Sequence, residues 1–193
     1  MNIAFDVDGV LANFEKNVKM VSDELFPGLM PEGYVPQDWD YTDIFTKREW
    51  NMIWDKIRMI PDFWQRQPDI PEAVQALKEF RMINGSPIWF ITSRMATGGI
   101  SAKYQTQLWL LSRQLITLKE AQNHVIAVSK PEEKRYWIEL NNINVSIDDS
   151  GSTVIRHNGI YGHKAWLLDQ PWNKQDTLLP RVFSVKEFLE KIS

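Results

Sequence analysis

The sequence contains no cysteine, which excludes disulfide bonds, thiol catalysis and zinc–thiolate sites. It also has no apolar run approaching the roughly 20 residues of a membrane helix, so no membrane span is expected. Positive and negative charges nearly balance, with a net charge of −3 at pH 7. The sequence has no basic stripe, so a stable nucleic-acid partner is not expected. The chain opens directly on strand-like residues, so we expect a cytoplasmic protein without a signal peptide.

The composition is typical of a globular domain. The length of 193 residues is enough for one domain with a modest insertion, and a hydrophobic content of 44% supports an apolar core. Nine of these residues are tryptophans, an unusual number for this length. The sequence leaves the oligomeric state open, a homodimer included.

The opening stretch carries the first chemical signal. Ile3–Val7 is a short apolar run interrupted by one acid, as in a buried strand, and Asp6 and Asp8 lie where that strand should end. Alternate residues of an extended chain share a face, so both carboxylates can point into one small volume. A bound Mg²⁺ would remove their repulsion, and Gly9 would let the backbone turn beside it. A strand end with two capping acids is the simpler interpretation of this stretch taken alone.

Strand-like and helix-like segments alternate along the rest of the chain. Strands are expected over Ile3–Val7, Pro87–Thr92, His124–Val128, Val145–Ile147 and Ala165–Leu168. Helices are expected over about Ala12–Leu25, from Pro71 to before Gly85, over Tyr104–Leu115, after Pro131, and from Ser184 to Ile192. This alternation predicts a doubly wound, Rossmann-like α/β fold, in which helices cover both faces of a parallel sheet.

One stretch departs from this pattern. Residues 26–67 are rich in proline and aromatic residues, and Thr46 with Glu49 forms a capping box that begins an amphipathic helix. We expect a small helical cap over 26–67, inserted into a core domain made of 1–25 and 68–193.

Polar residues follow four of the predicted strands. The first strand leads into Asp6 and Asp8, the second into Thr92-Ser93-Arg94, the third into Ser129-Lys130, and the fourth into Asp148-Asp149. Ligands of open parallel sheets bind outside the carboxyl ends of the strands, so these groups should meet.

Together these groups are suited to phosphoryl transfer. Asp6 is the candidate nucleophile, which would form an aspartyl-phosphate, and Asp8 is the candidate general acid and base. Asp6, Asp8, Asp148 and Asp149 would hold Mg²⁺, which with Lys130 would neutralise the phosphoryl charge. Thr92 or Ser93 would bind phosphate oxygens, and Arg94 could bind phosphate through two hydrogen bonds or form a surface ion pair.

This ordered set resembles the four motifs of the haloacid dehalogenase superfamily. The resemblance covers the whole chain and implies that Asp6 is the nucleophile and that Asp8 is the acid and base and lends its backbone carbonyl to Mg²⁺. Dehalogenases of the superfamily lack the second aspartate, so the presence of Asp8 points to phosphate chemistry. Lys134 competes with Lys130 for the phosphate lysine, and Lys130 is favoured because it lies nearer the predicted strand end.

A narrower resemblance is to the 5′(3′)-deoxyribonucleotidases. The stretches that carry it are residues 6–14, Pro61–Trp64 with Ile70–Leu77, and Leu168–Asn173. It implies a small-molecule phosphomonoester as the substrate, namely a nucleoside monophosphate, with Phe14 near the base. Arg94 departs from the residue expected after Thr-Ser in that family.

The cap aromatics admit two interpretations. Trp50 and Trp54 share one helical face and favour core packing, whereas Phe63 and Trp64 are adjacent, so one can pack while the other meets the ligand. Phe14, Phe63 and Trp64 are therefore candidate substrate-binding residues. A phosphatase of another small phosphomonoester or of nucleic-acid ends, and a nucleotide-binding module without turnover, remain the alternatives. The sequence does not choose between deoxyribose and ribose, or between bases.

Overall fold

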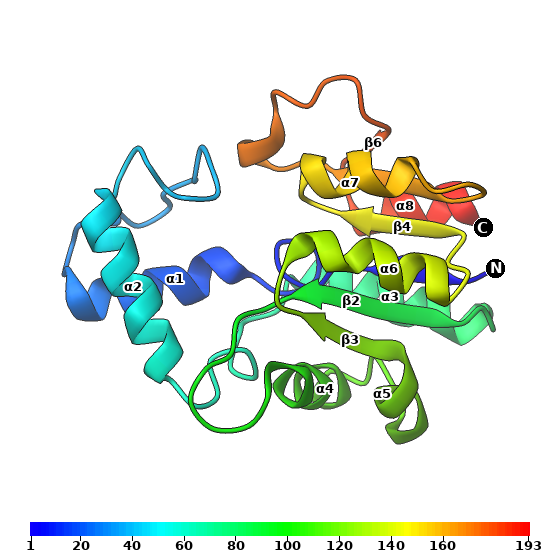
Figure 1. The fold of residues 1–193 in the computed structure, drawn as a ribbon, viewed down its shortest axis with the longest axis horizontal. Coiled ribbons are helices and arrows are strands. Elements are labelled where there is room, and N and C mark those ends of the chain that lie inside the picture. The colour runs from blue at the N-terminus through cyan, green and yellow to red at the C-terminus, as the bar shows by residue number, and fades with distance from the viewer.

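The computed structural model describes residues 1–193, and its centre is a six-stranded sheet in the order β3-β2-β1-β4-β5-β6 (Figure 1). The strands are β1 (Ile3–Phe5), β2 (Ile88–Ser93), β3 (Val125–Val128), β4 (Val145–Asp148), β5 (Lys164–Leu168) and β6 (Arg181–Val182). All neighbouring strands run parallel. The predicted Rossmann-like sheet is confirmed, with β1 at its centre between β2 and β4.

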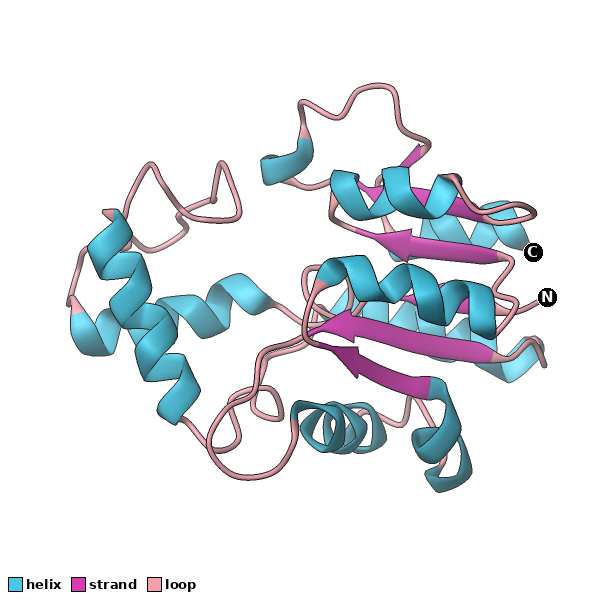
Figure 2. Cartoon of the chain, viewed as in Figure 1, coloured by secondary structure: helices cyan, strands magenta, loops and turns pink.

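Helices cover both faces of this sheet (Figure 2). The helices of the chain are α1 (Phe14–Leu25), α2 (Lys47–Met59), α3 (Pro71–Ile83), α4 (Ala102–Ser112), α5 (Leu118–His124), α6 (Lys134–Leu140), α7 (Gly151–Asn158) and α8 (Val185–Ile192), with short 3₁₀ turns η1 (Pro131–Glu133) and η2 (Pro171–Asn173). Of these, α1 and α2 pack with each other in the cap and do not lie on the sheet. In β1, Ile3 and Phe5 pack into the main core with α3, α4 and α8, whereas Ala4 packs on the opposite face with Ile138 of α6. This alternation is the two-residue period of a strand buried on both faces.

The cap lies beyond the carboxyl ends of the strands, whose arrowheads point towards it in Figure 1. It has its own apolar core, which gathers buried residues from both of its helices and the loops around them: Phe14, Val18, Val21, Met30, Tyr41, Phe45, Trp50, Ile53, Ile57, Phe63 and Trp64. Helix α1 was expected in the core domain, but its apolar face packs in this cluster. The packing unit of the cap therefore begins near residue 14 and not at residue 26.

Two chain segments join the cap to the core domain, and they lie side by side. The Asn13 N–H donates to the Pro68 carbonyl (2.8 Å), and the Ile70 N–H donates to the Leu11 carbonyl (2.8 Å). These hydrogen bonds form a short ribbon that fixes where the chain leaves and re-enters the core.

Three elements were not predicted: α5, α7 and β6. Helix α7 carries few apolar residues and so shows no helical stripe, and β6 has only two residues. Helix α5 begins with a capping box formed by Thr117 and Glu120, a signal that is present in the sequence.

No helix of the structure combines the length and the apolar character that crossing a membrane would require.

Candidate active site

The first site residues lie in the tight loop that follows β1. The strand ends at Phe5, two residues earlier than predicted, because the Asp6 carboxylate accepts a hydrogen bond from the Val7 N–H (2.7 Å). Gly9 has a positive φ of +72°, and a Cβ at this position would lie 1.9 Å from Oδ2 of Asp149. Only glycine allows the loop to pack this closely against the acid from β4.

Three buried carboxylates converge at this point. Oxygen atoms of Asp6, Asp148 and Asp149 lie within 4.8 Å of one another, which is close enough for all three to contact one cation. Asp148 is already bound, by Lys134 Nζ (2.8 Å) and by the Ser150 N–H (2.9 Å). Both carboxylate oxygens of Asp149 are buried without any hydrogen-bond partner. A buried unpartnered carboxylate is costly, and a hard divalent cation would satisfy it.

The pKa shifts of the acids in this cluster also indicate a site for a cation. Burial, with the like charges of Asp148 and Asp8, raises the pKa of Asp6 to about 7. Burial and the charges of Asp6 and Asp148 also raise the pKa of Asp149 well above its usual value. One lysine does not compensate for this many acids, so a bound cation would be needed to keep them ionised at neutral pH.

The lysine of the site is Lys134, which corrects the prediction of Lys130. Lys134 Nζ lies 3.1 Å from Asp6 Oδ2 and is buried, whereas Lys130 is exposed to solvent. The reason is η1, because this turn carries the chain back so that Lys134, at the first position of α6, points towards the strand ends. Burial alone would lower the pKa of Lys134, but Asp148 and Asp6 raise it above its ordinary value and keep the lysine charged.

Arg94 and Thr92 both contact Asp8. The Arg94 guanidinium donates to both oxygens of Asp8 at 2.8 Å, and Thr92 Oγ1 donates to Oδ2 at 3.1 Å. Arg94 was predicted to bind phosphate or to lie at the surface, but it is buried and its guanidinium pairs with the Asp8 carboxylate. Although burial raises the pKa of Asp8, the neighbouring Arg94 holds it below its ordinary value. Thr92 is likewise buried, so of these two neighbouring residues only Ser93 lines the pocket.

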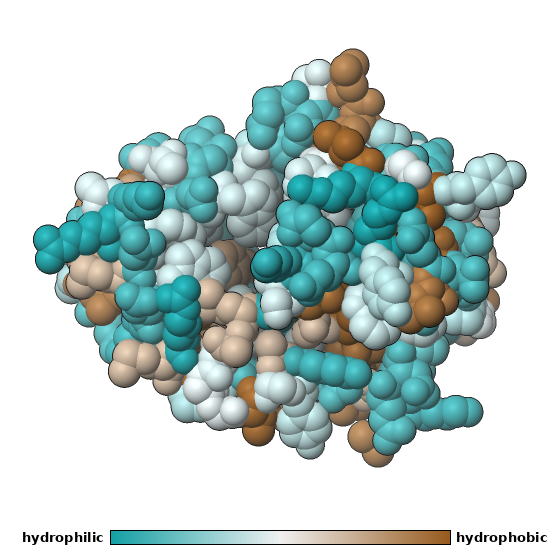
Figure 3. Space-filling model, in the orientation of Figure 1, coloured by the Kyte–Doolittle hydropathy of each residue, from teal (hydrophilic) through white to brown (hydrophobic).

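A pocket of about 250 Å³ opens above the acids, between the cap and the core domain. The space-filling view is hollowed at this junction (Figure 3). The floor and part of the wall of this pocket are polar, and the residues that form them are Asp6, Asp8, Ser93, Lys134, Asp148, Asp149, Ser150 and Thr153. The same space therefore contains the acid cluster, a fixed positive charge and a free hydroxyl.

The remaining wall of the pocket is aromatic. Phe14, Trp39, Trp54 and Trp64 line it, and the rings of Trp54 and Trp64 stack on Phe14 with centroids 5.8 and 6.2 Å away. Phe63 packs inside the cap cluster and does not reach the pocket, so the structure separates the adjacent pair as the sequence suggested. Trp50 packs in the cap core, whereas Trp54, expected beside it, turns its ring to the pocket.

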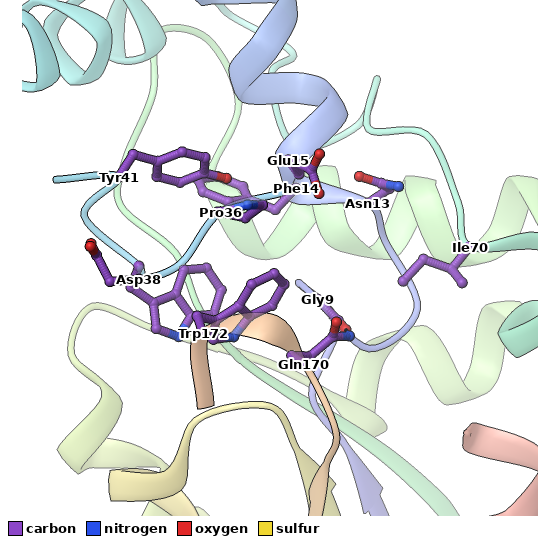
Figure 4. A pocket seen from close by; sticks show the side chains of 11 residues that line it. Gly9, Asn13, Phe14, Glu15, Pro36, Asp38, Tyr41, Ile70, Gln170 and Trp172 are labelled. Carbon is purple, nitrogen blue, oxygen red and sulfur yellow. Dashed lines mark hydrogen bonds between the residues drawn. The ribbon is translucent and has the colours of Figure 1, made fainter. Parts of the chain in front are cut away.

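Phe14 and Trp39 also line a second, smaller cavity of about 70 Å³ (Figure 4). The Gln170 side chain lies against Gly9 there and donates a hydrogen bond to its carbonyl (2.8 Å). The indole of Trp172, on the core domain, contacts the indole of Trp39 on the cap, with ring centroids 5.1 Å apart. This is a contact between cap and core at the edge of the active-site pocket.

Comparison with known structures agrees with this fold. A haloacid dehalogenase-like hydrolase from Streptococcus pneumoniae has a TM-score of 0.63 and 11% identity over 100% of this chain and 98% of its own. A haloacid dehalogenase-like protein from Agrobacterium tumefaciens gives 0.61 and 14% over 99% and 96%, and an L-2-haloacid dehalogenase from Xanthobacter autotrophicus gives 0.55 and 12% over 99% and 97%. The fold is that of the haloacid dehalogenase-like hydrolases.

A family model makes the assignment more specific. Residues 1–192 match the model described as 5′ nucleotidase, deoxy (pyrimidine), cytosolic type C protein, and the chain belongs to this family. Comparison with curated protein sequences found no match. The family that the sequence motifs resembled is thereby confirmed.

Proposed function

We propose that the protein hydrolyses nucleoside 5′-monophosphates, with deoxyribonucleoside 5′-monophosphates as the preferred substrates. The observation that carries this proposal is a single pocket with phosphate chemistry on its floor and aromatic rings on its wall. The acids and Lys134 suit the phosphate, and the rings of Phe14, Trp54 and Trp64 suit a nucleobase, which can stack on any aromatic face. The family description supports the nucleotide and the deoxyribose, and its word "cytosolic" supports a cytoplasmic location.

We further propose Mg²⁺ as the cofactor, held by Asp6 and Asp149 with Asp148 beside them. The unpartnered oxygens of Asp149 support this, because carboxylate oxygens are the ligands that Mg²⁺ prefers in proteins. The resemblance implies that Asp8 adds its backbone carbonyl. When bound, the cation would neutralise negative charge on the phosphoryl group.

The residues of the chain then divide the chemistry among them. A carboxylate oxygen of Asp6 attacks phosphorus, the bond to the 5′ oxygen breaks, and that oxygen leaves with a proton from Asp8. Lys134 fixes the Asp6 carboxylate and offers positive charge to the phosphoryl oxygens, and Ser93 donates a hydrogen bond to one of them. Water then attacks phosphorus in the aspartyl-phosphate and gives a proton to Asp8. The bond from phosphorus to the Asp6 oxygen breaks and inorganic phosphate leaves, which restores both side chains. The cap and its aromatic wall exclude other water from the pocket during this step.

Mg²⁺ is expected to stabilise the protein, and Asp149→Asn is expected to remove most of that effect. A ligand at 100 times its dissociation constant stabilises a folded protein by about 2.7 kcal/mol. Thermal unfolding with and without Mg²⁺ measures this shift. It should shrink as the pH falls through about 7, because Asp6 then takes up a proton that competes with the cation.

Asp55→Asn is the matched control, because Asp55 is an exposed acid on α2 that pairs with Arg58. This variant should keep the full Mg²⁺ shift. An Asp149→Asn protein that Mg²⁺ stabilises as strongly as it does the wild type would remove Asp149 from the cation site.

A substrate panel tests the proposed activity. It contains deoxyribo- and ribonucleoside 5′-monophosphates, 2-deoxyribose 5-phosphate, a 5′-phosphorylated oligonucleotide and 2-chloropropionate, with released phosphate or chloride measured. If a base stacks on the aromatic wall, kcat/KM for the deoxynucleotides should exceed that for 2-deoxyribose 5-phosphate at least about tenfold, since stacking contributes about 1–3 kcal/mol. Equal rates with and without a base would point to a general sugar phosphatase, and chloride release would contradict phosphate chemistry.

A further inference from the structure

Arg94 is fully buried, and its guanidinium encloses the carboxylate of Asp8. Nε donates to Oδ2 and Nη2 donates to Oδ1, each at 2.8 Å, and the Arg94 side chain is 0% exposed. Two parallel hydrogen bonds from a planar guanidinium fix both the position and the plane of a carboxylate, which a lysine at this place could not do.

Two further N–H groups of Arg94 donate to side chains other than Asp8. Nη1 donates to Thr106 Oγ1 (2.7 Å), and Nη2 donates to Gln67 Oε1 (2.7 Å). The guanidinium also lies over the ring of Trp64, 4.9 Å from its centroid. No part of this side chain is directed at a phosphate in the pocket, so its contribution to catalysis must pass through Asp8.

Two of these partners connect Arg94 to the cap. Trp64 belongs to the cap cluster and lines the active-site pocket. Gln67 immediately precedes Pro68, which pairs with Asn13 in the ribbon that joins cap and core. Arg94 itself follows β2 in the core domain, and its backbone N–H donates to Val128 at the end of β3 (2.9 Å). Arg94 therefore links Asp8 in the core domain to the aromatic wall of the pocket and to the residue next to the ribbon that joins cap and core.

We propose that Arg94 is the positioning residue for Asp8, and that it makes the alignment of Asp8 with the leaving oxygen depend on the position of the cap. This inference deepens the proposed function and rests on it. As the phosphorus–oxygen bond breaks, the 5′ oxygen takes the proton of Asp8, and Asp8 becomes a carboxylate. The Arg94 fork fixes the position and the plane of the Asp8 carboxyl group, so it sets where Asp8 stands relative to the leaving oxygen.

A merely structural arginine would behave differently. Its loss would lower stability and reduce the hydrolysis of every substrate by the same factor. A residue that acts through the general acid matters most where the leaving oxygen needs a proton. The 5′ alkoxide of a nucleotide needs one, whereas the p-nitrophenolate of p-nitrophenyl phosphate leaves without one.

The experiment therefore compares thymidine 5′-monophosphate with p-nitrophenyl phosphate in the presence of Mg²⁺. Arg94→Gln should lower kcat for the nucleotide about 100-fold and kcat for the aryl ester less than about fivefold, with KM nearly unchanged. Arg94→Lys should fall between the wild type and Arg94→Gln. Equal losses on both substrates would overturn the inference.

A double-mutant cycle makes the test independent of folding losses. Once Asp8→Asn has removed the acid, adding Arg94→Gln should cost less than about threefold more, because the arginine has nothing left to position. If the kcat losses of the two single variants multiply in the double variant, Arg94 does not act through Asp8. Thr106→Val is the matched control, since it removes one buried partner of Arg94 without touching Asp8, and it should leave the ratio between the two substrates unchanged.

The link to the cap has its own variant. Gln67→Met keeps the Arg94–Asp8 pair but removes the hydrogen bond from Arg94 to Gln67, beside the ribbon that joins cap and core. It should lower kcat for the nucleotide about five- to tenfold more than for the aryl ester. The Gln67→Met variant also tests the inference if Arg94→Gln fails to fold. A wild-type protein that hydrolyses neither ester would contradict the proposed function, and this inference with it. A wild type active on both, with a ratio that no Arg94 or Gln67 variant changes, would overturn this inference alone.

Discussion

Replacing Asp6 with asparagine is expected to lower kcat for phosphomonoester hydrolysis by about 10⁴-fold or more. The amide keeps the shape of the side chain but cannot attack phosphorus to form an acyl phosphate. Steady-state release of phosphate measures the loss. Borohydride trapping, which reduces an acyl phosphate, should modify Asp6 in the wild type only.

The same variant should fold normally, which separates the chemistry from the structure. Burial and the charges of Asp148 and Asp8 raise the pKa of Asp6 to about 7, so its ionised form is unfavourable in the metal-free protein. A group whose pKa is raised on folding reduces stability above its unfolded value, so the neutral amide should leave the thermal midpoint at pH 8 equal or higher. Turnover above about 1% of the wild-type rate would rule out Asp6 as the nucleophile.

Lys134→Gln is expected to lower kcat/KM about 100- to 1,000-fold, whereas Lys130→Ala should change it less than about twofold. Lys134 lies 3.1 Å from Asp6 and 2.8 Å from Asp148, and no other cation contacts both acids. Lys130 is an exposed lysine at the start of η1. Kinetics on a nucleoside monophosphate at saturating Mg²⁺ compare the two variants directly.

Thermal unfolding of the Lys134→Gln and Lys130→Ala variants provides the control for the kinetic comparison. Removing one partner of a buried ion pair costs about 3–5 kcal/mol, so the Lys134 variant should unfold at a lower temperature without Mg²⁺ and recover part of that loss with it. The reverse result, in which Lys130→Ala is inactive and Lys134→Gln is not, would restore the assignment made from the sequence.

The sheet was predictable because its evidence is local. Each predicted strand is a short apolar run, and a chain of alternating strands and helices has few topologies once its crossovers are right-handed. The acids were predictable for the same reason, since Asp6, Asp8 and Asp149 follow strand ends, and parallel strands bring those ends to one edge.

The assignments that failed depend on geometry that no local pattern contains. Lys130 was favoured for its closeness to the end of β3, but one turn of η1 brings Lys134 back to the acids. The partner of Arg94 lies 86 positions earlier in the chain, so no spacing rule could pair it with Asp8. Similarly, the periodicity of α1 showed which face is apolar, but not whether the core domain or the cap would cover it.

The Trp39–Trp172 contact gives the molecule an optical reporter of its own. One indole belongs to the cap and the other to the loop after β5, so any displacement of the cap must separate them and change their local polarity. The chain has nine tryptophans, so the difference in intrinsic fluorescence between the wild type and Trp172→Phe isolates this pair and follows the cap without an attached dye.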